Sequence, residues 1–339
     1  KNNELYPVKT EFKYQHFIFT AETHNFPTGI APFPGAATGV GGRIRDSIAI
    51  GKGGNMVAGT AGYSVGRLCI ENYETNYVYC DNIDFSQLPN SPIKILIEAS
   101  NGASDYGNKI GEPIIIGFTR SFGNSKYEYL KPIMFCGGIG TMNNEHIEKE
   151  IPVKGNLVVR VGGPTYRIGV GGGSASSRTQ DDNNRELDFN AVQRGDPQME
   201  NRLVKFIMSC VEMGINNPIK SIHDQGAGGM GNVTKEIVSP MGAFIDLAKV
   251  NLGDNSLSAL EIWTAESQEQ VTILIDSSDK ENIIKLAARE NIPLEFIGHI
   301  TDDGKITVIN SKEKAEKTEK AEKTEKAEKA EKAEKAEKS

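Results

Sequence analysis

The stretch AETHNFPTGIAPFPGAATGVGGRIRD, residues 21–46, combines a single histidine, two carboxylates, two arginines and clustered glycines. Clustered glycine lets the backbone approach another group closely, because no Cβ stands in the way. A glycine-rich turn that enters a helix can cradle a phosphate with its N–H groups. The glycines expected to form this turn are Gly35, Gly39, Gly41 and Gly42. Arg43 or Arg45 could then pair with the bound anion.

The residues that flank this stretch add a second kind of chemistry. Glu22 and Asp46 supply hard oxygen ligands of the type that Mg²⁺ prefers beside a phosphate. His24 lies between these two candidate ligands. A glycine-rich loop alone is weak evidence, since many such loops are plain turns. The combination of loop, carboxylates and imidazole favours a nucleotide site.

Two further glycine-rich segments leave alternatives open. VGGPTYRIGVGGGSASS (161–177) is either a tight connection after a strand or an anion-binding nest. HDQGAGGMGN (223–232) follows an expected strand, so Asp224 lies at the sheet edge where α/β proteins bind ligands. Asp224 is there either a metal ligand or a helix cap. AVQRGDP (191–197) and AESQEQ (265–270) carry amide and hydroxyl groups suited to a ribose or an amide, although alone they are ordinary surface.

Charge and cysteine content exclude several classes of function. The net charge of −7 argues against nucleic acid, which calls for a concentrated basic surface. The four cysteines form no CxxC pair, so we expect neither a zinc knuckle nor a disulfide framework, and a reducing compartment is the default. The chain has no apolar run long enough to span a bilayer, and residues 1–15 lack a signal-peptide core. We therefore expect a cytoplasmic protein without a membrane partner.

Short apolar runs alternate with helical patterns ahead of residue 312, which is typical of an α/β or α+β fold. The runs expected to be strands are HFIFTAET (16–23), NMVAGTAGYSV (55–65), EPIIIGFT (112–119), KPIMFCGGIG (131–140), NLVVRVGG (156–163), IKSIHD (219–224), EQVTILID (269–276) and EFIGHI (295–300). DPQMENRLVKFIMSCVEMG (196–214) predicts an amphipathic helix that begins after Asp196, and residues 280–292 predict another.

The chain divides into two expected domains and a tail. We place the boundary after residue 150, which gives domains 1–150 and 151–311. Residues 312–339 consist of Glu, Lys, Ala and a few small hydroxyl residues and contain no large apolar side chain. Such a segment cannot bury a core.

Seven of these motifs occur in an order that resembles one family. They are TAETHNFPTGIAPFPGAATGVGGRIRD, ASNGASDYGNKIGEP, KPIMFCGGIGTM, RIGVGGGSASS, LDFNAVQRGDPQME, HDQGAGGMGN and ALEIWTAESQEQ. Together they resemble the large, eukaryotic-type phosphoribosylformylglycinamidine (FGAM) synthases over about residues 17–309. The resemblance implies the first half of a synthetase core. Its fold would be that of aminoimidazole ribonucleotide (AIR) synthetase, with an N-terminal domain whose sheet forms a barrel with a partner and a C-terminal α/β domain.

The resemblance also implies an activity, in which formylglycinamide ribonucleotide (FGAR), ATP and ammonia from glutamine give FGAM, ADP and phosphate through an iminophosphate. His24 would be the general base, and Glu22, Asp46 and Asp224 would bind Mg²⁺. The implied substrate-binding residues are Thr23, Asn25, Phe26, Arg45, Gly172, Gly173, Ser174, Gln193, Glu266, Ser267 and Gln268. The implied ATP-binding residues are Gly35, Ala36, Ala37, Thr38, Gly39, Val40, Gly41, Gly42, Arg43, Ile44, Arg45 and Asp46.

Full-length members of the family also carry a second homologous half and a glutaminase domain, and neither is present in this chain. We therefore expect ammonia to come from elsewhere, and an apolar sheet face to be exposed unless a homodimer or the missing half covers it. Two alternatives remain. One is another ATP-dependent enzyme of the same superfamily, and the other is a non-catalytic half that holds nucleotide structurally.

Overall fold

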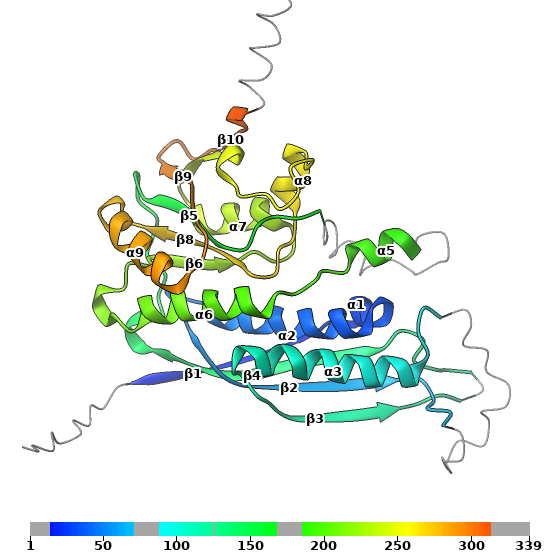
Figure 1. Ribbon diagram of the computed structural model, residues 1–339. Helices are drawn as coiled ribbons and strands as arrows, with labels where there is room; N and C mark the ends of the chain where they lie inside the picture. The colour runs from blue at the N-terminus through cyan, green and yellow to red at the C-terminus, as the bar shows by residue number, and fades with distance from the viewer. Residues whose placement is uncertain (1–13, 71–87, 125, 168–184, 313–339) are drawn as a thin grey trace, which may run out of the picture.

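The computed structural model describes residues 14–70, 88–124, 126–167 and 185–312, and these form two mixed sheets with helices between and around them (Figure 1). The first sheet has the order β1-β4-β2-β3. Its strands are β1 (Gln15–Thr23), β2 (Asn55–Val65), β3 (Ile114–Ser121) and β4 (Ile133–Asn143). β2 pairs parallel with β3, whereas β4 pairs antiparallel with both β1 and β2. The expected α/β fold class is confirmed.

The second sheet has six strands in the order β10-β7-β9-β5-β8-β6. They are β5 (Leu157–Gly162), β6 (Ser221–Asp224), β7 (Gly242–Asp246), β8 (Gln270–Ile275), β9 (Leu294–Thr301) and β10 (Ile306–Ile309). β7 and β10 were not among the expected strands. All other strands fall within three residues of their expected bounds, because each contains an apolar run that the sequence makes visible.

Helices fill the space between the two sheets (Figure 1). The α-helices are α1 (Asn25–Ile30), α2 (Pro32–Ile48), α3 (Pro92–Ile110), α5 (Arg185–Ala191), α6 (Pro197–Val211), α7 (Gly229–Val238), α8 (Ala259–Thr264) and α9 (Lys280–Glu290). Single 3-10 turns are η2 (Asn144–His146), η4 (Gly214–Asn216), η5 (Leu247–Lys249) and η6 (Ser277–Asp279). α2 and α3 lie side by side on the first sheet, and α6 lies between them and the second sheet.

Helix α6 is where the sequence pattern and the structure agree most closely. Asp196 caps its N-terminus, with its carboxylate accepting from the backbone N–H groups of Gln198 and Met199. Leu203, Phe206, Ile207 and Cys210 are all fully buried, as the predicted apolar face requires. α6 thereby joins the two sheets through one large apolar cluster that contains residues from both. The boundary at residue 150 stays a prediction.

Two observations bear on the expectations from composition. In the part of the chain that the structure describes, no helix combines the length and the apolar character needed to cross a bilayer. Cys69 takes part in a disulfide bond, contrary to our expectation, and its partner lies outside the described residues. Spacing along the sequence does not reveal which cysteines approach within bonding distance in space. Most of the tail (313–339) also lies outside the described residues.

Among the described residues, the outer face of the first sheet carries exposed apolar side chains, as we expected from the sequence. Phe17 and Phe19 on β1 are 72% and 76% exposed, while Ile18 between them is buried. Ile115 and Ile116 on β3 are 66% and 69% exposed. The alternation on β1 follows from the two-residue period of a strand, which turns every second side chain away from the helices. Exposed apolar surface of this kind marks an interaction site.

Candidate active site

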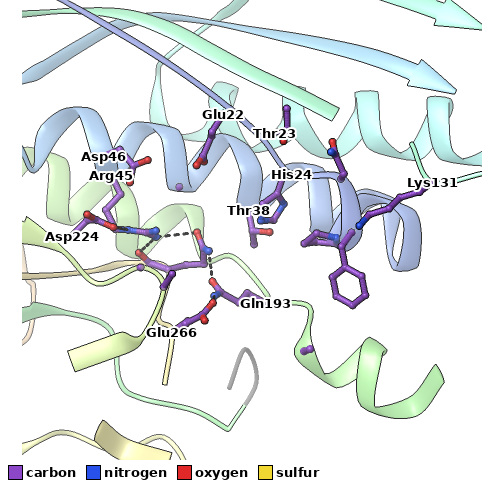
Figure 2. A pocket seen from close by; sticks show the side chains of 18 residues that line it. Glu22, Thr23, His24, Thr38, Arg45, Asp46, Lys131, Gln193, Asp224 and Glu266 are labelled. Atoms are coloured by element: carbon purple, nitrogen blue, oxygen red, sulfur yellow. Dashed lines mark hydrogen bonds and ion pairs between the residues drawn. The ribbon is translucent and has the colours of Figure 1, made fainter. Parts of the chain in front are cut away.

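A cavity of about 520 Å³ lies where the end of β1, helix α2 and the loops of the second sheet meet. It is lined by Glu22, Thr23, His24, Asn25, Phe26, Pro27, Thr38, Gly42, Arg45, Asp46, Lys131, Ala191, Gln193, Asp224, Gly226, Ala227, Glu266 and Gln268. Figure 2 shows Asp46, Arg45 and Asp224 at one end, His24 and Thr38 in the middle and Lys131 at the other end. Most of the predicted site residues are therefore brought together from positions far apart in the sequence.

The predicted glycine-rich turn is wrong, because residues 32–48 form the continuous helix α2. Backbone N–H groups inside a helix donate to its own carbonyls, so they are not available to a phosphate. The glycines serve close packing instead. A Cβ on Gly39 would lie 2.9 Å from the side chains of both His24 and Cys136, and one on Gly41 would lie 2.8 Å from the Tyr106 ring.

The predicted ATP-binding residues separate into two groups. Thr38, Gly42, Arg45 and Asp46 line the cavity. The others face the interior of the protein or other helices and do not line it: Gly35, Ala36, Ala37, Gly39, Val40, Gly41, Arg43 and Ile44. Only the first group remains a candidate for nucleotide contact.

Arg43, which we expected to pair with a bound anion, forms an ion pair with a carboxylate of the protein. Its guanidinium is fully buried and forms a bidentate pair with Glu112, with Nη1–Oε1 at 2.7 Å and Nη2–Oε2 at 2.5 Å. Gly59 and Gly138 leave room for this guanidinium, since a Cβ on either would collide with it. Arg43 therefore cannot pair with an anion in the cavity.

Three carboxylates interact through their charges at the acidic end of the cavity: Glu22, Asp46 and Asp224. Burial, followed by the negative charge of Asp224, raises the pKa of Asp46 to about 7. Burial also raises the pKa of Glu22. Burial alone would raise the pKa of Asp224, but the hydrogen bond from His223 and the charge of Arg45 hold it at about 2.

This donor set fits Mg²⁺ in kind. Buried carboxylates with raised pKa values repel one another, and a divalent cation would relieve that repulsion. In the described residues, however, no three His, Cys, Asp or Glu side chains are already arranged to hold a metal ion. Mg²⁺ usually takes one or two carboxylates and completes its shell with water and ligand phosphates, so a closed protein cage is not required. Glu22, Asp46 and Asp224 stay predicted ligands.

His24 is held in one orientation at the centre of the cavity. Its Nδ1 lies 2.5 Å from the carbonyl oxygen of Gly35. A carbonyl can only accept a hydrogen bond, so Nδ1 carries the proton and Nε2 has the free lone pair. Burial lowers the pKa of His24 to about 4. The imidazole is therefore neutral at pH 7.

A chain of hydrogen bonds crosses the floor of the cavity and connects α2 to the second sheet. Arg45 Nη1 donates to the carbonyl oxygen of Gln268 at 2.5 Å and to its Oε1 at 3.0 Å. Gln268 Nε2 donates to Gln193 Oε1, and Gln193 Nε2 lies 3.5 Å from Glu266 Oε2. Arg45 Nε lies 3.5 Å from Asp224 Oδ2. The amides and carboxylates linked by these hydrogen bonds therefore hold one another in position, and they can also contact a ligand.

The remaining predicted substrate-binding residues differ in how available they are. Thr23 is exposed at the cavity. Asn25 Oδ1 already accepts from the backbone N–H of Met134 at 2.9 Å, and Phe26 is 2% exposed. Ser267 lines a smaller adjoining cavity of about 270 Å³. Gly172, Gly173 and Ser174 lie outside the described residues.

Sequence reasoning missed Lys131 and Glu269, two charged residues of this region. Lys131 reaches the cavity from the segment before β4, which we had treated only as a strand. Glu269 is buried behind the amide chain, where its Oε1 accepts from Tyr106 Oη at 2.9 Å and from the backbone N–H of Asp196 at 2.8 Å. A lysine before a strand and a glutamate beside AESQ carry no sequence signal for these contacts, because both depend on long-range packing.

The chain is similar to known proteins along most of its length. Residues 153–310 match the family described as AIR synthase related protein, C-terminal domain. A phosphoribosylformylglycinamidine synthase of Dictyostelium discoideum is 56% identical over 303 residues, which cover 86% of this chain and 22% of that protein. The chain is similar to one part of the phosphoribosylformylglycinamidine synthases. The resemblance seen in the sequence is confirmed, and the chain spans about a fifth of the length of the curated relatives that it matches.

Solved structures of the family give the same result for the fold. A structure described as Thermotoga maritima PurL complexed with FGAR matches with a TM-score of 0.70 at 26% identity, covering 88% of this chain and 44% of that chain. The complex of the same protein with ATP matches with a TM-score of 0.66 at 25% identity, covering 88% and 42%.

Proposed function

We propose that this chain supplies the nucleotide- and substrate-binding part of a phosphoribosylformylglycinamidine synthase. The enzyme would convert FGAR, ATP and ammonia to FGAM, ADP and phosphate. The observation that carries this proposal is the convergence of His24, three carboxylates and the Arg45–Gln268–Gln193 chain around one cavity. The relative's name and the FGAR and ATP complexes of PurL support the choice of substrates.

The proposed reaction has two steps. The amide oxygen of FGAR attacks the γ-phosphorus of ATP and ADP leaves, while the amide nitrogen loses its proton to solvent and becomes the imine nitrogen of an iminophosphate. Ammonia then adds to the iminophosphate carbon, and the carbon–oxygen bond breaks to release phosphate. One proton must leave the nitrogen as it joins carbon, and we assign its acceptance to His24 Nε2, the ring nitrogen not bonded to Gly35.

The other residues would bind and orient the reactants. Glu22, Asp46 and Asp224 would hold Mg²⁺, which would neutralise charge on the transferred phosphate. Thr38 and Gly42, on the same helix as Asp46, would contact the nucleotide. The side-chain amides of Gln193 and Gln268 can each donate to and accept from the amide of the substrate. Thr23, Asn25, Phe26, Arg45, Glu266, Ser267, Gly172, Gly173 and Ser174 remain proposed substrate contacts.

The partners of the chain belong to the same proposal. Ammonia would come from a glutaminase, and the exposed face around Phe17, Phe19 and Ile116 would be covered by a second copy or by a second synthetase half. We also propose that the enzyme works in the cytoplasm.

The test combines binding and turnover. Calorimetry should show saturable binding of FGAR and of a non-hydrolysable ATP analogue with Mg²⁺ to the chain. With ammonium chloride as the nitrogen source, His24→Ala should lower FGAR-dependent ADP release by about 100-fold or more, since general base catalysis contributes that much. His16→Ala is the matched control, because His16 bonds Asn144 at an exposed site. Wild-type chain that binds neither ligand would refute the proposal, and equal rates for wild type and His24→Ala would remove His24 as the base.

A further inference from the structure

His223 precedes Asp224 at the end of β6 and contacts its carboxylate. Both residues belong to the described part of the chain, and of the two only Asp224 lines the cavity. His223 Nδ1 lies 2.9 Å from the backbone carbonyl oxygen of Asp224 and 3.3 Å from its Oδ1. Both oxygens can only accept a hydrogen bond, so Nδ1 carries a proton and donates toward them. The ring therefore contacts a predicted metal ligand without itself lining the cavity.

Helix α7 holds the other side of the His223 ring. His223 Nε2 bonds Glu236 Oε2, and Glu236 Oε1 accepts from Asn232 Nδ2 at 2.9 Å. Asn232 and Glu236 are four residues apart on α7, so they lie on the same face of the helix. The contacts thus run from α7 through the imidazole to the Asp224 carboxylate. A ring bonded at both nitrogens cannot rotate without losing one of these bonds.

The two oxygens of the Asp224 carboxylate have different surroundings. Oδ1 faces His223, whereas Oδ2 lies 3.5 Å from Arg45 Nε, which is a long contact. Gly226 lines the cavity and leaves room for Oδ2, since a Cβ on Gly226 would lie 2.8 Å from that oxygen. Because the ring takes Oδ1, Oδ2 is the oxygen that the carboxylate can offer to a cation in the cavity.

The alternative is that His223 and Glu236 simply tie β6 to α7. The Glu236 side chain is 45% exposed, however, and an ion pair with an exposed partner contributes little to stability. What the pair does is restrict the imidazole, and through it the orientation of Asp224. The two readings differ in what a substitution at His223 should change.

We infer that His223 is a positioning residue for the metal site, which holds the Asp224 carboxylate with Oδ2 turned to the cation. The inference rests on the proposed function, which makes Asp224 a ligand of Mg²⁺. Hydrogen bonds to a ligating carboxylate fix its orientation, and loss of such a partner typically lowers metal affinity about 10–100-fold.

The experiment measures the dissociation constant of Mn²⁺ on the full chain at fixed pH, from the electron paramagnetic resonance signal of the free ion. Mn²⁺ takes the place of Mg²⁺ because both prefer oxygen ligands. His223→Leu removes both ring nitrogens and should weaken Mn²⁺ binding about tenfold or more. His223→Asn keeps an N–H donor near the position of Nδ1 and loses the bond to Glu236, so it should recover most of the affinity. His16→Leu, at an exposed histidine, is the matched control and should bind Mn²⁺ like wild type.

Calorimetry with FGAR is the second measurement. His223→Leu should bind FGAR like wild type, because the substitution acts on the metal ligand alone. Equal losses of Mn²⁺ and FGAR affinity in His223→Leu would indicate a general disturbance of the site and would overturn the inference. Equal losses of Mn²⁺ affinity in the leucine and asparagine variants would do the same, since they would show that the tie to Glu236 is what matters. If His223→Leu does not fold, His223→Asn and Glu236→Ala still decide: the first should bind Mn²⁺ more tightly than the second, and the reverse order would overturn the inference.

Asp224→Ala separates this inference from the proposed function. If Asp224→Ala weakens Mn²⁺ binding and His223→Leu does not, the inference is overturned while the proposed function stands. If wild type and Asp224→Ala bind Mn²⁺ equally, or neither binds it, Asp224 is not a metal ligand, and both the inference and that part of the proposed function fall.

Discussion

Glu269 is a buried carboxylate whose ionisation should weaken the fold as pH rises. Burial raises its pKa to about 7, although its hydrogen bonds with Asp196 N–H and Tyr106 Oη act in the other direction. Glu200, also fully buried, lies nearby on α6 and makes no hydrogen bond through either side-chain oxygen. The interior beside the amide chain therefore contains two acids that favour the protonated form.

The size of the effect follows from the difference between folded and unfolded pKa values. The unfolded value is near 4.5, so between pH 4.5 and 7 the folded protein retains a proton that the unfolded chain has lost. The free energy of unfolding then falls as pH rises through this window. A difference of about 2.5 pKa units corresponds to roughly 3 kcal/mol, at 1.36 kcal/mol per unit.

Glu269→Gln tests this reasoning. The amide keeps an oxygen that can accept from Tyr106 and Asp196, but it cannot ionise. Urea unfolding of wild type and variant at pH 5, 6, 7 and 8 gives the difference in free energy of unfolding. Between pH 5 and pH 8 we expect the variant to gain roughly 2.5 kcal/mol in free energy of unfolding relative to wild type. The charge of Glu269 raises the pKa of Glu200, so the difference between the two proteins reports Glu269 together with its effect on Glu200.

Glu281→Gln, at an exposed position on α9, is the control and should follow wild type at every pH. Parallel curves for wild type and Glu269→Gln between pH 5 and 8 would show that Glu269 is ionised throughout and would refute the argument.

Two further predictions concern the buried pair and the open sheet face. Glu112→Ala should lower the free energy of unfolding, measured in urea, by about 3–5 kcal/mol, because it leaves the buried Arg43 guanidinium without its partner. The control is Glu98→Ala, which removes an exposed pair with Lys94 and should cost less than about 1 kcal/mol. Similar losses for the two variants would contradict the structural role assigned to Arg43. In sedimentation velocity the isolated chain should self-associate, because the Phe17 and Phe19 rings are 72% and 76% exposed on one face. The double variant Phe17→Ser, Phe19→Ser should shift the chain toward monomer. A wild-type chain that stays monomeric at all concentrations would argue against a second copy on this face.

Helix α6 and most strands could be predicted from the sequence because local pattern and tertiary packing agree there. Asp196 before an apolar face of period 3.6 indicates both the start and the buried side of α6. Helix α2 could not be predicted in the same way. Each interior glycine costs a helix about 1 kcal/mol relative to alanine, so PFPGAATGVGG looks like a turn. Packing against Tyr106, His24 and Cys136 outweighs that cost, and these contacts are invisible in the sequence.

The sequence indicated which residues line the candidate site better than it indicated how they are arranged. The motifs correctly brought Glu22, His24, Asp46 and Asp224 to one cavity. The two arginines of RIRD could not be told apart, although Arg43 is locked to Glu112 and Arg45 connects two layers. The short β10 was missed because four residues give too little period to recognise.

Strand β1 has a consequence for how assembly and chemistry could communicate. Phe17 and Phe19 face outward from it, while Glu22 at its end lines the cavity. Whatever docks on those rings touches the very peptide that carries the carboxylate, with no intervening layer to absorb a change in strand twist. A contact on those rings therefore acts on the position of Glu22 through a backbone path only a few residues long.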